Sequence, residues 1–133
     1  MHHARTAKKT LLLALGAIAM DTHSPAKFTS NEVDHLLDYA DTYPDDGMLL
    51  RPSKIQLAAQ SDAGYLNENN TKSRDSAHMF LSANIPIPAF NGAVLTIAQV
   101  IKFVMSSAAE AELASLFITT RKCVELRHTL IEI

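Results

Sequence analysis

The spacing of apolar residues divides the chain into a helical first part and an alternating second part. Apolar residues recur at helical spacing over residues 7–20. Thr29 and Glu32 have the spacing of a capping box, which predicts the start of a second helix. Its apolar face would consist of Val33, Leu36, Leu37, Ala40 and Tyr43. Pro44 and Gly47 interrupt the pattern, so we expect a helical hairpin before residue 50.

The hydrophobic period changes after Pro52. Apolar and polar residues alternate from Ile55, which predicts a strand that ends at Asp62. A polar turn over residues 63–73 would lead to a second strand at about 76–82. A loop over 83–92 with a turn signal at Asn91-Gly92 would lead to a third strand at about 94–105. Three strands in short succession favour an antiparallel meander.

A final helix is predicted after Ser107, which has capping-box spacing to Glu110. We expect this helix to pack across the sheet through an apolar stripe of Leu113, Leu116, Phe117, Thr120, Val124 and Leu130. The predicted fold class is therefore α+β: a helical hairpin, a three-stranded antiparallel meander and an α-helix. We place the boundary between the helical part, 1–50, and the second part, 51–133, at the change of period.

Composition narrows the class of protein. The chain has 133 residues, 47% hydrophobic and 20% charged, which is typical of a globular domain or two small ones. Its formal net charge of −2 argues against a freestanding basic nucleic-acid binder, although an enzyme could still meet nucleic acid through a local patch. The single cysteine, Cys123, excludes an internal disulfide and a cysteine-based zinc site. We expect no membrane-spanning helix, because no apolar run reaches about 18 residues.

Residues 1–19 allow two interpretations. A basic start, an uncharged stretch over 11–19 and the small-x-small ending Ala17-Ile18-Ala19 are typical of a secretory signal peptide. The same stretch has the spacing of a buried helix. A sequon at Asn69-Asn70-Thr71 would matter only in a secreted protein.

Two carboxylates are candidate metal ligands. Asp62 follows a predicted strand, and Glu112 lies in the first turns of the final helix, whereas Glu110 is better explained as a cap. Carboxylates from a strand and a helix can converge on one Mg²⁺ or Mn²⁺, which prefer oxygen ligands. The alternative is structural, because Asp suits strand ends and Glu suits helix N-termini. Lys72 and Arg74, with Lys102, could contact a phosphate backbone or form an ordinary solvated surface.

Several motifs together resemble the ribonuclease H region of copia-type LTR retrotransposon polyproteins. They are SDAGY at 61–65, KSR at 72–74, FLS at 80–82 and SSAAEAEL at 106–113. Upstream, HAR at 3–5, LLALGAIA at 12–19 and LLDYADTYPD at 36–45 are similar to the segment that joins reverse transcriptase to ribonuclease H. The resemblance covers nearly the whole chain and implies a partial ribonuclease H-like fold after residue 50.

The resemblance implies a metal-dependent nuclease that cuts the RNA strand of an RNA–DNA hybrid. Asp62 would bridge the metals and Glu112 would be the helix ligand, with Mg²⁺ or Mn²⁺ as the cofactor. Members of the family carry two later acids, and this sequence ends at Ile133 before both. We therefore expect a fragment with little or no activity alone, whose partners are the hybrid and the remainder of the polyprotein. The missing neighbouring strand would leave an exposed sheet edge open to self-association.

Two other functions remain open from the sequence. The same fold could be a non-enzymatic binding or assembly module, with Asp62 and Glu112 as surface acids. Alternatively, the chain could be a small secreted α+β protein that begins after Ala19. The resemblance favours the helical interpretation of the first residues, so we expect an intracellular protein without a membrane anchor.

Overall fold

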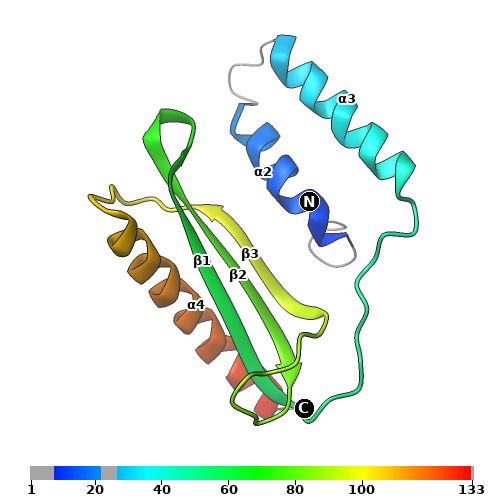
Figure 1. Cartoon of the computed structure of the whole chain (residues 1–133), viewed down its shortest axis with the longest axis vertical. Helices are drawn as coiled ribbons and strands as arrows, with labels where there is room; N and C mark the ends of the chain where they lie inside the picture. The colour runs from blue at the N-terminus through cyan, green and yellow to red at the C-terminus, as the bar shows by residue number, and fades with distance from the viewer. Residues whose placement is uncertain (1–7, 22–26, 133) are drawn as a thin grey trace. The chain divides into compact units, whose positions relative to one another are not determined.

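The computed structural model of the chain describes residues 8–21 and 27–132. These residues form two compact units, one up to Met48 and one from Leu49, and each is described by itself (Figure 1). The sequence pattern placed the division two residues later, between residues 50 and 51. Residues 1–7, which include His2, His3 and Arg5 of the basic start of the predicted signal peptide, lie outside the described residues, as does part of the predicted loop over 21–29.

The described residues of the first unit form a short 3₁₀ turn and two α-helices. They are η1 (Lys9–Leu11), α2 (Leu12–Asp21) and α3 (Lys27–Thr42). Lys8 connects this unit internally, because its Nζ donates to the backbone oxygens of Ala40, at 3.4 Å, and Tyr43, at 2.5 Å. The predicted start of the second helix at Thr29 is wrong: α3 begins at Lys27, so Thr29 lies within its first turn.

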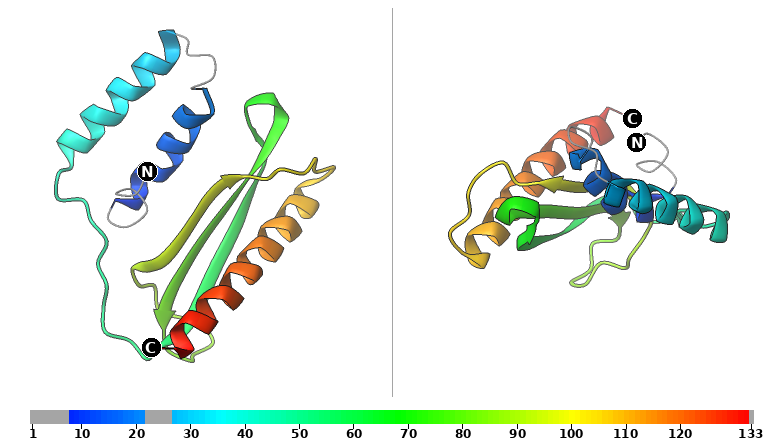
Figure 2. Two further views of the ribbon diagram at one scale, coloured as in Figure 1. Left: turned by 180° about the vertical axis from the view of Figure 1, so that it is seen from behind. Right: turned by 90° about the horizontal axis from the view of Figure 1, so that it is seen from above.

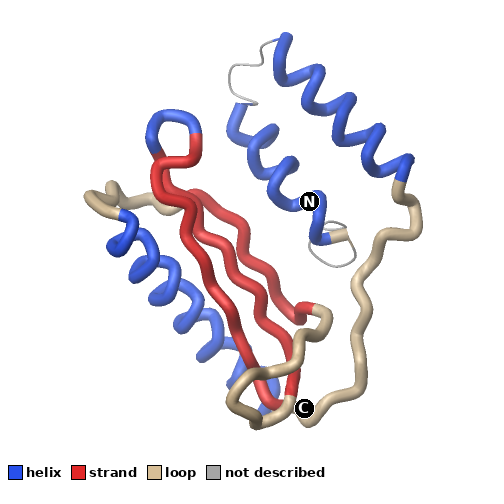
Figure 3. Tube along the Cα trace, viewed as in Figure 1, coloured by secondary structure: helices blue, strands red, loops and turns tan. Residues whose placement is uncertain are grey.

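The second unit contains a three-stranded sheet and one long helix (Figure 3). The elements are β1 (Gln56–Glu68), β2 (Lys72–Ser82), β3 (Ala93–Val100) and α4 (Ala108–Ile131). The strands lie in the order β1-β2-β3 and both neighbouring pairs are antiparallel. The α+β class and the predicted order of strands and final helix are confirmed.

The first hairpin is longer than the sequence pattern predicted. β1 continues six residues past Asp62 to Glu68, and the chain turns through η2 (Asn69–Thr71). Gly64, Asn67 and Glu68 make this stretch resemble a turn in sequence, but an edge strand can keep polar side chains in water. At the other end, β3 stops at Val100 instead of continuing to Met105.

Helix α4 covers one face of the sheet and runs along β1 (Figures 1 and 2). The buried core beneath its second half consists of Ala77, Met79 and Ile97, against which Ile118 and Leu126 pack. Successive strand residues point to opposite faces, so the odd-numbered residues of β1 and β2 face α4 and the even-numbered residues face away from it. This alternation determines where each candidate site residue points.

One of the two hydrogen bonds of the predicted capping box at the start of α4 is confirmed. Ser107 is the N-cap, and its hydroxyl accepts a hydrogen bond from the Glu110 backbone N–H at 3.2 Å. The Glu110 carboxylate does not return to Ser107 but accepts from the backbone and hydroxyl of Ser106, both at 2.6 Å. These bonds hold the pKa of Glu110 below its ordinary value. Glu110 is therefore occupied as a cap.

The prediction that α4 packs on the sheet through the stripe of Leu113, Leu116, Phe117 and Val124 is wrong, because these side chains are exposed. Leu113 is 66% exposed and Phe117 is 62% exposed. The helix instead buries the small residues Ala111, Ser115 and Thr119 against the sheet, with Ile118 and Leu126 beside them. Small side chains allow a helix and a strand to approach closely, so the apolar stripe is left on the opposite side of α4. No helix in the described part of the chain is both long enough and apolar enough to cross a membrane.

Candidate metal site

Asp62 lies in the middle of β1, not at its end as predicted. Its side chain is exposed. Ala63 packs toward α4 beside Ala111, so the alternation of the strand directs the Asp62 carboxylate to the opposite face of the sheet. β1 is one of the two edge strands of the described sheet, and on its outer side no described strand pairs with it.

The backbone at Asp62 is fixed from both faces of the sheet. Its carbonyl oxygen accepts from the hydroxyl of Ser115 on α4 at 3.0 Å and from the hydroxyl of Ser76 on β2 at 3.1 Å. The Ser115 hydroxyl has one proton, so at any moment it donates either to this carbonyl oxygen or to the carboxylate of Asp75 on β2. The strand position that carries the candidate acid is therefore tied directly to the helix that carries the other.

Glu112 is exposed and lies three residues before Ser115 on α4. Residues three apart are neighbours on a helix surface, so Glu112 lies one turn from the hydroxyl that binds the Asp62 backbone. The two carboxylates start from opposite faces of the sheet. An ion that contacts both would have to lie at the outer edge of β1, between the strand and the helix.

Asp75 is a third acid of this region that the sequence analysis missed. It is fully buried on β2, where it accepts from the Ser115 hydroxyl at 2.6 Å and from the Gln99 side-chain amide at 3.2 Å. Burial raises the pKa of Asp75, and the two hydrogen bonds oppose that rise. The pairing with Gln99 across the meander could have suggested Asp75, but a carboxylate in a strand is usually exposed.

The two basic candidates differ in their surroundings. Lys72 is exposed at the start of β2. Arg74 is buried and forms an ion pair with Glu68, and this pairing holds the pKa of Glu68 below its ordinary value. In this structure the Arg74 guanidinium is thus committed to Glu68 and is not presented to a phosphate. Contact between Lys72 and a nucleic-acid backbone stays a prediction.

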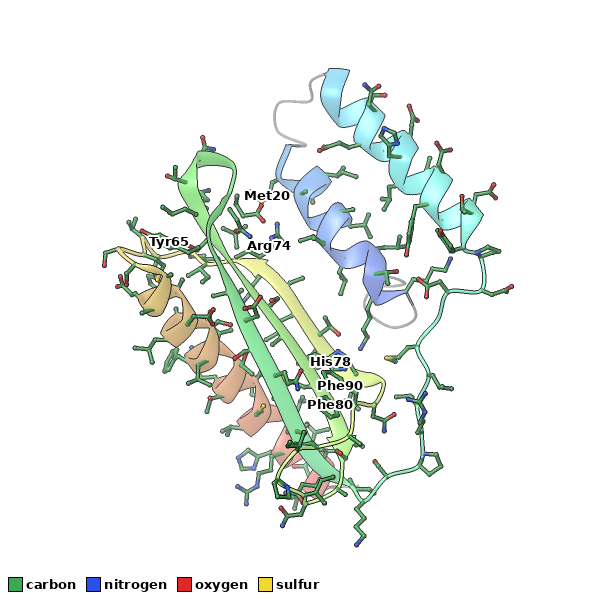
Figure 4. The ribbon with its side chains drawn as sticks, in the orientation of Figure 1. Met20, Tyr65, Arg74, His78, Phe80 and Phe90 are labelled. Carbon is green, nitrogen blue, oxygen red and sulfur yellow. The ribbon has the colours of Figure 1, made fainter. Side chains whose placement is uncertain are left out.

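The face of the sheet away from α4 carries an aromatic cluster that the sequence pattern did not show. His78 and Phe80 lie beside Phe90 from the following loop, and the Phe80 and Phe90 rings stack at 5.4 Å between centroids (Figure 4). His78 Nε2 lies 3.0 Å from the backbone oxygen of Asn91. The cluster holds the loop between β2 and β3 against the sheet.

The Asn91 side chain satisfies all of its hydrogen-bonding groups. Its Oδ1 accepts from the backbone N–H groups of Arg51 and Gly92, both at 2.8 Å. Its Nδ2 donates to the backbone oxygens of Arg51, at 2.9 Å, and Leu81, at 3.0 Å. The predicted turn residue therefore also fixes a segment 40 residues earlier in the chain.

The two candidate ligands, Asp62 and Glu112, are of the type that magnesium binds, but two carboxylates make a small site. Asp62 and Glu112 supply the carboxylate oxygens that Mg²⁺ and Mn²⁺ prefer. Among the described residues, no cluster of three or more His, Cys, Asp and Glu side chains is placed to bind a metal. Cys123 is half-buried against the core, and burial raises the pKa of its thiol, which suits a core residue.

Comparisons of the chain with protein-family models, curated proteins and solved structures gave no match.

Proposed function

We propose that residues 51–133 are part of a ribonuclease H-like domain of a copia-type element, with Asp62 and Glu112 as its metal-binding acids. The observation that carries the proposal is the hydroxyl bond from Ser115 on α4 to the backbone of Asp62 on β1. It joins the strand and helix that the resemblance assigns to the metal site. The order of three antiparallel strands followed by a helix supports the same assignment.

In this proposal the two acids hold a divalent cation weakly at the outer edge of β1. When bound in a complete site, such ions activate water and stabilise the leaving oxygen of a phosphodiester. Two carboxylates are fewer than the four on which the family's pair of ions depends, so we expect no efficient cleavage by this chain alone. The substrate class would be an RNA–DNA hybrid, recognised through its shape and backbone. The resemblance also assigns the protein to the cell interior.

The test measures metal binding and cleavage separately. Mn²⁺ is added to the labelled chain, and paramagnetic broadening of amide signals is followed by NMR. We expect broadening first at Asp62, Ala63 and Glu112, and its loss in Asp62→Asn and Glu112→Gln. Glu125→Gln is a matched control, because Glu125 is exposed on the same helix and pairs with Lys122. Equal broadening at all exposed acids, unchanged in the variants, would exclude the metal site.

Cleavage of a labelled RNA–DNA hybrid with Mg²⁺ or Mn²⁺ completes the experiment. We expect the chain and both variants to show the same background. Cleavage that is lost in Asp62→Asn and in Glu112→Gln would support the site and overturn the expected inactivity. Cleavage that survives in both variants would point to a contaminant and contradict the assignment.

A further inference from the structure

A cavity of about 350 Å³ lies within the first unit, between α2 with η1 and α3. The two helices lie side by side (Figures 1 and 2). Helix α2 contributes Ala14 and Ala17, whose small side chains fill little of the space between the helices. Helix α3 contributes one of its faces, because Glu32, Leu36 and Tyr39 follow one another at intervals of four and three residues. A volume of this size is within the range of small-molecule sites.

The wall of the cavity is mostly apolar and reaches the surface of the unit. Leu11, Ile18 and Leu36 line it together with the two alanines. Leu11 is buried, and Ile18 and Leu36 are half-buried. Ala14 and His35 are exposed members of the lining, so a ligand can enter from outside. An apolar body that enters would remove these side chains from water, which is favourable.

Glu32 is an acid of this wall that the fold leaves without a partner. Its Oε2 atom is shielded from solvent, and no donor among the described residues bonds to it. Buried polar atoms nearly always have a partner, so this atom requires an explanation. The hydroxyls of Thr10 and Tyr39, which also line the cavity, instead donate to the Asp46 carboxylate, at 3.0 and 3.4 Å. The described lining includes no Lys or Arg side chain that could neutralise Glu32.

These features select the charge and the shape of a ligand. A carboxylate only accepts hydrogen bonds, whereas a primary ammonium group carries a positive charge and three N–H donors. The terminal torsion of a glutamate side chain is soft, so the Glu32 carboxylate can turn toward a donor in the cavity. Tyr39 lies two helical turns after Glu32, about 10 Å along α3. An apolar body of that length would lie against Leu36 and the alanines while its ammonium group bonds to Glu32.

We propose that the cavity between α2 and α3 binds a small amphiphilic amine, whose ammonium group bonds to the Glu32 carboxylate. The inference does not depend on the proposed nuclease function, because Asp62 and Glu112 belong to the other unit.

The probes are octylamine, octanol and octanoate, which share one apolar chain and differ in the head group. Each is added to the full chain, and the methyl and amide signals are followed by NMR. We expect octylamine to shift the methyl signals of Leu11, Ile18 and Leu36, with a dissociation constant on the order of 1 mM. Octanol lacks the charge and should bind about tenfold more weakly. Octanoate should bind more weakly still, because it would place a second carboxylate beside Glu32.

Glu32→Gln should weaken the binding of octylamine about tenfold and leave the binding of octanol unchanged. Asp34→Asn is the matched control, because Asp34 is exposed on the same helix and lies outside the lining. It should change neither affinity. Ala17→Leu should fill the cavity and prevent both octylamine and octanol from binding. Circular dichroism would verify that each variant folds.

Equal affinity for octylamine and octanoate would overturn the proposal, as would unchanged octylamine binding in Glu32→Gln. Shifts confined to residues outside the lining would place the bound amine elsewhere and would also contradict it. Signals of the lining that change with protein concentration, without any probe, would show that a second copy of the chain covers the cavity instead.

Discussion

The Ser115 hydroxyl lies 2.6 Å from the buried carboxylate of Asp75 and 3.0 Å from the backbone oxygen of Asp62. A hydroxyl has one proton, so it cannot donate to both oxygens at once. If Asp75 is protonated, its own proton can be donated to Ser115, and Ser115 can then donate to Asp62. The rise in the pKa of Asp75 that burial causes favours this arrangement.

Asp75→Asn should remove a pH dependence of stability. A carboxyl whose pKa is raised by folding stabilises the folded state below its unfolded pKa, and this contribution is lost as pH rises through the folded pKa. Asp75 should therefore contribute a fall in the free energy of unfolding as pH rises from about 4, opposite in sign to the contributions of Glu68 and Glu110, whose pKa values folding lowers. In Asp75→Asn this fall should disappear, with a gain of about 1 kcal/mol at pH 7, because an amide can donate to Ser115 and accept from Gln99.

Urea denaturation at several pH values measures the effect. Glu132→Gln, at an exposed position after α4, serves as the control and should keep the original pH profile. A variant Asp75→Asn that is less stable than the original chain at pH 7 would show that the ionised carboxylate is the stabilising form.

Ser115→Ala should loosen the attachment of α4 to the sheet. The change leaves the buried Asp75 carboxyl without its closest partner and the Asp62 carbonyl without one of its two donors. We expect a loss of about 1–3 kcal/mol in the free energy of unfolding. Thr129→Ala is a suitable control, because the Thr129 hydroxyl bonds only within its own helix. Equal stability of the two variants would refute this role of Ser115.

Asn91→Asp should destabilise the loop between β2 and β3 more than Asn91→Ala does at pH 7. The aspartate would place a carboxylate oxygen where the amide donates to the backbone oxygens of Arg51 and Leu81. Alanine removes these bonds without adding repulsion, at a cost of about 1–3 kcal/mol. Hydrogen exchange at the Arg51 and Gly92 amides measures the loosening. The difference between the variants should narrow at pH 4, and a constant difference would contradict this explanation.

Thr71→Gly should stabilise the first hairpin. Thr71 has φ 53°, a left-handed conformation that costs a β-branched residue roughly 1–2 kcal/mol and glycine very little. Thermal unfolding should show a higher midpoint in this variant. Lys72→Gly, one residue later at φ −88°, should lower the midpoint instead, because glycine gains no conformational advantage there. A lowered midpoint in both variants would exclude backbone strain at Thr71.

The order of helices and strands could be predicted because the spacing of apolar residues changes from a helical period to alternation at the end of the first unit. The length of β1 could not, since Gly64 and Asn67 are typical turn residues. In the structure Gly64 lies so close to Asn67 that a Cβ there would lie 2.0 Å from the Asn67 amide nitrogen. Glycine is therefore accommodated by packing within the hairpin and does not end the strand.

The orientation of α4 could not be predicted from hydrophobicity alone. Leu113 and Phe117 are the large apolar residues of a regular stripe, and such a stripe normally faces the core. The sheet side instead contains Ala111 and Ser115, whose small volume and hydroxyl bond to β1 decide the packing. Asp75 was missed for a related reason, because its acceptance of a hydroxyl proton depends on a residue 40 positions away.

The one-sided pairing of β1 has a consequence for the motions of its backbone. In an antiparallel pair, successive residues direct their amides alternately to the partner strand and away from it. Amides of β1 that bond to β2 should exchange with deuterium slowly, whereas those between them, on the open side, should exchange fast. This alternation between slow and fast exchange would disappear if another strand paired with the open side of β1. The hydrogen-exchange rates along β1 thus show whether another strand is paired with that edge.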